Sequence, residues 1–352
     1  MTMTSAARLR ILLALLLLGA AASLPAAAED LTVVNYGGNI QDWSRNHFWK
    51  PFAAETGIKV IEDTRDYGIG IIRTKVAGGA NTWDVVAAED IEVIQGCEEG
   101  LFQKLDWLKI AYKEKLLPQA VLPCAQGEVI YAMMIGYDGK RITGEGPKNW
   151  ADFWNTKKWP GKRVLYKDPR DSLEAALLAD GVARDQVYQV LSTSAGVDRA
   201  FRKLTELKPN LLWWTNPGQS RQMLISGDAV MSATFGGGLL LLNRREHTDF
   251  KLAWDDAILH IDYWAIVKGT PHLAAAMQFL NFASRADRQA AFANEGLQGV
   301  PNRDADALID RAVSPNLVTT VQNLKVALPS SAPFWLEHYD TLNQRFTAWL
   351  SQ

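Results

Sequence analysis

The chain has 352 residues, which is enough for two domains of ordinary size, each with its own hydrophobic core. Its 37 lysines and arginines nearly balance 39 aspartates and glutamates, which gives a formal net charge of -2. Because nucleic acids and membrane surfaces attract clustered positive charge, this composition argues against either as a partner.

The N-terminal residues 1–28 have the pattern of a cleaved signal peptide. Two basic residues, Arg8 and Arg10, precede an apolar run from Ile11 to Ala22, and small residues at Ala26–Ala28 suit a cleavage site. The apolar run is shorter than the roughly 20 residues that span a bilayer. We therefore expect a soluble protein that is exported to the periplasm and begins near Glu29.

The rest of the sequence alternates short β-rich runs with helical ones, which predicts α/β layers on a largely parallel sheet. Several predicted strands end in glycines or acids, as at Gly37–Gly38 and Glu89–Asp90, and strand ends of this kind hold ligands in α/β proteins. Two long segments, Gly127–Asp138 and Ala257–Val267, are expected to pass between two domains. The predicted strands are Leu31–Tyr36, Lys59–Asp63, Trp83–Ala88, Gly127–Asp138, Arg163–Tyr166, Leu211–Trp214, Ala229–Phe235 and Ala257–Val267. The predicted helices are Asp42–Glu55, Trp150–Trp154, Ser172–Ala179, Val197–Lys208, Ser220–Ser226, Leu273–Ala283, Ala286–Ala293 and a terminal helix after Pro333.

The two cysteines, Cys97 and Cys124, both lie in the exported part, where an oxidising compartment favours a disulfide. Such a bond stabilises a chain by about 3 to 4 kcal/mol in the chain-entropy model. The five histidines are scattered without an HxxxH pair, and no CxxC occurs. We therefore expect no metal and no other cofactor.

Motifs of catalysis are absent: the sequence has no GxSxG, HExxH, GxxxxGK[ST] or GxGxxG. A periplasmic enzyme is therefore the least favoured class. The residues that suit ligand binding are acids and aromatic rings at predicted strand ends, although each has a structural alternative. Asp171, for example, precedes a predicted helix and suits a helix cap, and most of the 13 tryptophans suit a core.

Several segments in this order resemble the spermidine/putrescine-type periplasmic solute-binding proteins of ABC importers. The resemblance runs through nearly the whole exported part. The segments are Tyr36–Gly38, Phe48–Val60, Trp83–Val86, Gly100–Leu101, Asn149–Trp154, Pro160–Arg163, Gly227–Val230, Asp262–Ile266 and Gly299–Asn302.

This resemblance implies an α/β periplasmic-binding-protein fold of type II, with two α/β lobes joined by crossing hinge strands. Lobe 1 is expected at 29–137 and 263–309, and lobe 2 at 138–262 and 310–352. It also implies a monomer without catalysis that closes over a small-molecule ligand, an amine or amino acid, and presents it to membrane permease subunits of an ABC transporter.

The resemblance also implies which residues form the site. Acids of the second lobe, Asp168 and Asp171, are expected to receive an amine, because carboxylates and rings together suit an ammonium group. Phe235 is expected to precede a glycine turn. The full set of implied ligand-binding residues is Tyr36, Glu89, Asp90, Asp168, Asp171, Trp214, Thr215, Phe235, His260 and Asp262.

Two departures leave the ligand open. Relatives that bind γ-aminobutyrate-like amino acids resemble this chain but carry an arginine where Gly238 stands, so Arg170 or Arg221 would have to hold a carboxylate. His260 and Gln298 stand where aromatic residues are expected. A polyamine such as putrescine or spermidine is the first expectation, and an amino acid, a phosphonate or another small solute is the alternative. Ferric iron is disfavoured because no Tyr-Tyr pair occurs.

Overall fold

The computed structural model describes residues 30–78 and 82–352, so the predicted signal peptide lies outside the described residues. These residues hold one nine-stranded sheet in the order β2-β1-β3-β8-β4-β7-β5-β6, with β9 paired to β8. The strands are β1 (Leu31–Asn35), β2 (Val60–Thr64), β3 (Val85–Glu89), β4 (Ala125–Asp138), β5 (Arg163–Tyr166), β6 (Leu211–Trp214), β7 (Met231–Phe235), β8 (Phe250–Ile266) and β9 (Leu328–Pro329).

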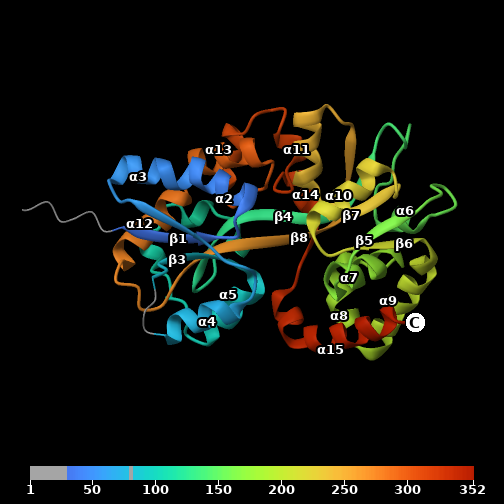
Figure 1. Ribbon diagram of the computed structural model, residues 1–352, viewed down its shortest axis with the longest axis horizontal. Coiled ribbons are helices and arrows are strands. Elements are labelled where there is room, and N and C mark those ends of the chain that lie inside the picture. Colours follow the sequence, from blue (N-terminus) through green and yellow to red (C-terminus); the bar gives the residue numbers. More distant parts are fainter. Residues whose placement is uncertain (1–29, 79–81) are drawn as a thin grey trace, which may run out of the picture.

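The sheet is parallel at both ends and antiparallel in its centre, which differs from the expected largely parallel sheet. Strands β1, β2 and β3 form one parallel group, and β5, β6 and β7 form another. The long strands β4 and β8 run antiparallel side by side through the middle of the molecule and join the two groups (Figure 1). Each long strand therefore takes part in both halves of the molecule, as expected of hinge strands.

Helices cover both groups of strands, and their boundaries follow from capping residues and apolar spacing. In α9, Thr193 caps the first turn and the buried residues Val197, Phe201 and Leu204 share one face. A π-helical turn at Arg45–Trp49 joins α2 to α3. The helices are α2 (Gly38–Ser44), α3 (Lys50–Thr56), α4 (Ile69–Ala77), α5 (Asp90–Glu98), α6 (Trp150–Trp154), α7 (Pro169–Ala179), α8 (Val187–Leu191), α9 (Ser194–Leu207), α10 (Pro217–Ser226), α11 (Gly236–Glu246), α12 (Leu273–Ala283), α13 (Ala286–Gly296), α14 (Val321–Val326) and α15 (Ala332–Leu350).

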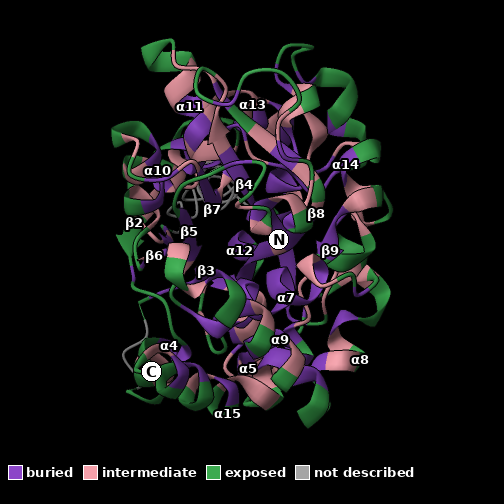
Figure 2. Ribbon diagram, turned by 90° about the vertical axis from the view of Figure 1, so that its right-hand side faces the viewer, coloured by how far each residue is buried: buried purple, intermediate pink, exposed green. Residues whose placement is uncertain are grey.

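Within the first group, strand β3 is buried on both faces. Val85 and Ala87 of β3 belong to one core, whereas Val86 and Ala88 belong to another, because successive side chains point to opposite faces of a sheet. The second group packs against α7, α9 and α15 in a third core. Figure 2 shows β4, β7 and β8 as buried elements with exposed residues on the helices around them.

The lobe boundaries stay a prediction, but side-chain packing bears on one of them. Val313 and Leu317 pack in the cores of the first group, although the expected second lobe includes 310–352. The chain joins the core of the second group at Leu328 in β9 and continues there with Trp335. We therefore favour a last crossing near β9 rather than at residue 310.

No helix within 30–78 and 82–352 combines the length and the apolar character needed to cross a membrane.

The expected disulfide is present between Cys97 and Cys124, whose Cα atoms lie 5.8 Å apart. It links the end of α5 to the residue before β4, and Cys124 is fully buried. The bond therefore fixes a helix that packs against the first parallel group to the start of one crossing strand.

Replacing both cysteines, Cys97→Ser with Cys124→Ser, should lower the free energy of unfolding. The bond closes a loop between residues 27 positions apart, so the chain-entropy model gives a loss of about 3 to 4 kcal/mol. Urea unfolding of the double variant measures this, and reduced and alkylated wild-type protein is the control. Equal unfolding free energies for the oxidised wild type and the variant would contradict the prediction.

Candidate functional site

A cavity of about 550 Å³ opens at the carboxyl ends of the strands in both parallel groups. Glu89 ends β3 on one side, and Tyr166 and Phe235 end β5 and β7 on the other. The crossing strands supply Tyr131 from β4 and Asp262 from β8. Strand ends of the two groups and the strands that join them thus line one cavity, which lies where α/β sheets bind ligands.

Glu89 and Asp262 form the acidic side of the cavity. They are directly opposite each other in the antiparallel pairing of β3 and β8, so their side chains project from the same face of the sheet. Burial raises the pKa of Glu89 to about 7, although the Arg170 charge opposes the rise. Burial and the Glu89 charge also raise the pKa of Asp262 well above its usual range. In the empty site, at least one of these carboxyls is therefore protonated near neutral pH.

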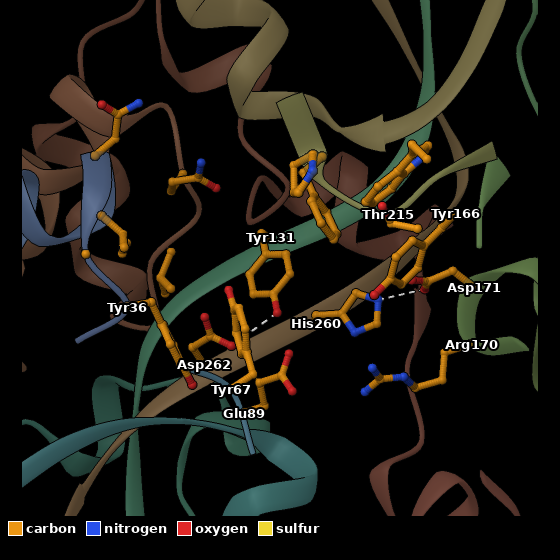
Figure 3. Close-up of a pocket in the computed structure, with 18 of the residues that line it drawn as sticks. Tyr36, Tyr67, Glu89, Tyr131, Tyr166, Arg170, Asp171, Thr215, His260 and Asp262 are labelled. Atoms are coloured by element: carbon orange, nitrogen blue, oxygen red, sulfur yellow. Dashed lines mark hydrogen bonds and ion pairs between the residues drawn. The ribbon is translucent and has the colours of Figure 1, made fainter. Parts of the chain in front are cut away.

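Tyrosine rings surround this acidic pair (Figure 3). The Tyr131 hydroxyl donates a hydrogen bond to Asp262 at 3.1 Å. Tyr36 and Tyr67 stack with their ring centroids 4.3 Å apart, and Tyr67 is 64% exposed. An exposed ring beside two acids can move against a ligand at little cost, and ring faces attract cations.

A buried ion pair holds Tyr36 in place. The Arg65 guanidinium pairs with Glu92, stands 5.0 Å from the Tyr36 ring centroid and donates to the Tyr36 hydroxyl at 3.2 Å. Glu92 also accepts the backbone N–H groups of Gly68 and Glu89. The same carboxylate therefore positions the ring, the start of α4 and the start of α5.

The side of the cavity formed by the second group carries both signs of charge. His260 Nε2 lies 2.8 Å from Asp171 Oδ1. Burial opposes the charged imidazole, but the Asp171 carboxylate outweighs it and raises the pKa of His260 to about 9. Arg170 stands beside them, with its Nε 3.3 Å from Asp168 and its guanidinium 5.2 Å from the Tyr339 ring centroid. At neutral pH this side therefore holds an internally paired imidazolium and carboxylate, together with an arginine.

Most of the residues implied by sequence line the cavity, but two do not. Asp90 begins α5, and its carboxylate accepts its neighbour's N–H at Ile91. Asp168 caps α7 by accepting the Arg170 N–H at 2.9 Å and also accepts the Tyr339 hydroxyl at 2.9 Å. The residues of the predicted set that line the cavity are Tyr36, Glu89, Asp171, Trp214, Thr215, Phe235, His260 and Asp262.

Two details differ from the sequence-based expectation. The expected glycine turn after Phe235 is the first turn of α11, which begins at Gly236. Asp171 has a left-handed backbone with φ of 65°, and its carboxylate is taken by His260, so it is not the free acid that was expected. Among the described residues that line the cavity, the acids without an ion-pair partner are the cross-strand pair Glu89 and Asp262.

Several aromatic residues of the cavity were not among those expected from the sequence. Tyr131 lies inside a long buried strand, and its polar hydroxyl there is a signal that could have drawn attention to it. Tyr67 lies in a loop and Tyr166 at a strand end, and neither position carries a distinguishing motif. Tyr166 stacks on Trp214 with ring centroids 4.3 Å apart, while the Trp214 N–H donates to the Ala233 carbonyl.

Across 30–78 and 82–352, no group of His, Cys, Asp and Glu suits a metal ion.

Comparison with known proteins yields a family match and close relatives. The family model for bacterial extracellular solute-binding proteins matches residues 48–314. A γ-aminobutyric acid-binding protein of Pseudomonas aeruginosa is 36% identical over 332 residues, which is 94% of each chain. The spermidine/putrescine-binding periplasmic protein of Escherichia coli is 23% identical over 84% of this chain and 85% of its own. A solved GABA receptor superposes with a TM-score of 0.81 at 32% identity, covering 91% of this chain and 97% of the receptor.

The raised pKa of Glu89 predicts a stability that falls as pH rises in the absence of ligand. The native protein keeps a proton up to about pH 7 that the unfolded chain releases near its ordinary value of 4.5, so native stability declines between those values. Glu89→Gln removes this titration and should raise stability at pH 8 by about 1 to 3 kcal/mol. Denaturant unfolding at pH 5 and pH 8 measures the effect.

The exposed neighbour Glu98 supplies the control variant, Glu98→Gln, on the helix that follows β3. It should retain the pH dependence of the wild type. A Glu89→Gln protein that loses as much stability as the wild type between pH 5 and pH 8 would refute the assignment.

Proposed function

The chain belongs to the bacterial extracellular solute-binding proteins, and we propose that it captures a small amino acid of the γ-aminobutyrate kind for an ABC importer. As a periplasmic solute-binding component it binds its ligand without transforming it. The observation that carries the choice of ligand is the unequal distribution of acids in the cavity. Among the described residues, Glu89 and Asp262 have no ion-pair partner, whereas Asp171 on the facing side is paired with His260.

An ammonium group suits the acidic side of this cavity. Glu89 and Asp262 are cross-strand neighbours, so one ammonium can contact both carboxylates while the Tyr36 and Tyr67 rings cover it. Charge-assisted hydrogen bonds and cation–π contacts are strong where water is excluded. The positive charge of the ammonium then takes the place of the proton that a carboxyl of this pair holds when no ligand is bound.

The opposite side of the cavity argues against a second ammonium. Arg170 and the imidazolium of His260 stand there, paired with Asp168 and Asp171, so the described residues of that side offer no free carboxylate to a second ammonium. A polyamine carries positive charge at both ends and would meet this side unfavourably, whereas an amino acid carries a carboxylate. The γ-aminobutyrate relatives are also the more similar ones, at 36% and 32% identity against 23% for the polyamine relative.

Capture is expected to proceed by closure of the two lobes. The crossing strands β4 and β8 supply Tyr131, His260 and Asp262, while the loops and strand ends of both groups supply the remaining walls. A ligand that contacts both groups stabilises the closed arrangement by as much as it binds that arrangement better than the open one. The membrane permease of the importer is the proposed partner of the closed form.

A ligand screen combined with solution scattering tests this function. γ-Aminobutyrate and related ω-amino acids should raise the melting temperature at saturating concentration and reduce the radius of gyration. Putrescine and spermidine should do so less or not at all. If only polyamines stabilise and compact the protein, its ligand is a polyamine and not an amino acid. If only phosphonates do so, both the amino-acid and the polyamine proposals are wrong.

Removing one acid of the pair should weaken amine binding strongly. Asp262→Asn leaves the ammonium with half of its counter-charge, at a cost of roughly 2 to 5 kcal/mol in binding free energy. Calorimetry with the best ω-amino acid measures the loss. Asp340→Asn is the matched control, because Asp340 is exposed on α15, and its affinity should equal that of the wild type.

Binding should also release protons near neutral pH. Since burial raises the pKa of Glu89 to about 7 and an ammonium lowers it again, affinity should increase between pH 6 and pH 8, by at most about tenfold per unit for each proton released. Calorimetry in phosphate and in Tris separates proton release from the binding heat. A pH-independent affinity with equal heats in both buffers would show that no buried acid ionises on binding.

A further inference from the structure

A smaller chamber of about 260 Å³ adjoins the main cavity. The two spaces share Asn39, Trp43, Phe235 and Gln298 as lining residues. The chamber therefore lies directly beside the main cavity, behind a wall that both spaces share. The chamber differs from the main cavity in that Arg221, a residue of α10, lines it.

Arg221 is a partly buried cation that has no hydrogen-bond or ion-pair partner within residues 30–78 and 82–352. Burial lowers the pKa of its guanidinium, and no acid among the described residues offsets that effect. Arg245 and Glu246 also line the chamber, but both are exposed, and their opposite charges balance each other. Arg170 and His260 of the main cavity are each already paired, with Asp168 and with Asp171. A guanidinium that has lost water without gaining an anion is costly unless a ligand supplies one.

The glycines at the start of α11 make room for this arginine. A Cβ atom at Gly238 would stand 2.7 Å from Arg221 Nη1 and 2.8 Å from its Cδ. A Cβ atom at Gly237 would stand 2.4 Å from Gln298 Nε2, the other polar group of the shared wall. Any larger residue at Gly238 would displace the guanidinium, so the chamber depends on the missing side chain.

We propose that Arg221 binds the carboxylate of the ligand in this chamber and thereby selects an extended zwitterion, with its ammonium at Glu89 and Asp262 and its carboxylate at the far end. A guanidinium suits this role because its planar fork matches both oxygens of a carboxylate. The inference rests on the proposed amino-acid function and adds which side chain reads the acid group and that ligand length matters.

Matched pairs of ligands test the chamber. γ-Aminobutyrate, δ-aminovalerate and ε-aminocaproate are each compared with the alkylamine of equal chain length, and affinities are measured by calorimetry. The wild type should prefer the best amino acid over its amine by at least about tenfold, the value of one charge-assisted contact. Arg221→Met should abolish that preference and leave the amine affinity within about twofold.

Three further variants keep the test decisive. Gly238→Ala retains every charge but displaces Arg221, so it should also reduce the preference. Arg221→Lys keeps a cation without the fork and should recover part of it. Arg311→Met removes an exposed arginine and should have no effect. Circular dichroism and melting curves establish that each variant is folded.

The outcomes separate the two proposals. If Arg221→Met or folded Gly238→Ala keeps the full preference of the wild type, the role of Arg221 is wrong while the amine site stands. If no amino acid binds the wild type, or if Asp262→Asn binds as well as the wild type, the proposed function fails, and the inference about Arg221 fails with it.

Discussion

Two carboxyl groups on neighbouring strands govern the chemistry of this protein. The register of β3 against β8 sets Glu89 opposite Asp262, and the surrounding residues bury Asp262 and cover Glu89 in part. Like charges in direct opposition are unfavourable in a sheet, and burial increases the cost. The arrangement is stable when a proton or a ligand cation lies between the acids. In the function that we propose, an ammonium takes the place of that proton, and relief of the unfavourable electrostatic energy of the buried pair contributes to the binding free energy.

The rest of the structure holds that pair in position. The crossing strands β4 and β8 carry Tyr131, His260 and Asp262 and also join the two groups, so a movement of one group against the other changes the surroundings of the acids. Arg65 and Glu92 fix Tyr36 from behind, and the disulfide ties α5 to the start of β4. A site with Tyr36 held by the Arg65–Glu92 pair and with the Tyr67 ring exposed is suited to closing over a ligand.

The sequence predicted the fold better than the site. Strands such as Arg163–Tyr166 and Leu211–Trp214 were predicted with their observed bounds, because β-rich runs flanked by turn residues mark strands clearly. Helices α4, α5 and α11 were missed. Gly68 just before α4, Glu89–Asp90 at the start of α5 and Gly236 at the start of α11 suggested turns or loops instead. Asp90 and Asp168 were expected to bind ligand, but an acid after a strand can equally begin or cap a helix, and here Asp90 is the first residue of α5 and Asp168 caps α7. Which rings meet in the cavity depends on pairing between β8 and its neighbours, and no local pattern reveals that.

The position of β8 in the sheet restricts the order in which the protein can fold. Strand β3 ends at residue 89, but its second neighbour runs to residue 266, and β9 joins β8 only at residues 328 and 329. The N-terminal group therefore cannot complete its hydrogen bonding until about three quarters of the polypeptide is available. Long-range pairing of this kind slows folding. A partly synthesised chain therefore cannot form the complete sheet. This suits a polypeptide that is exported across a membrane before it folds.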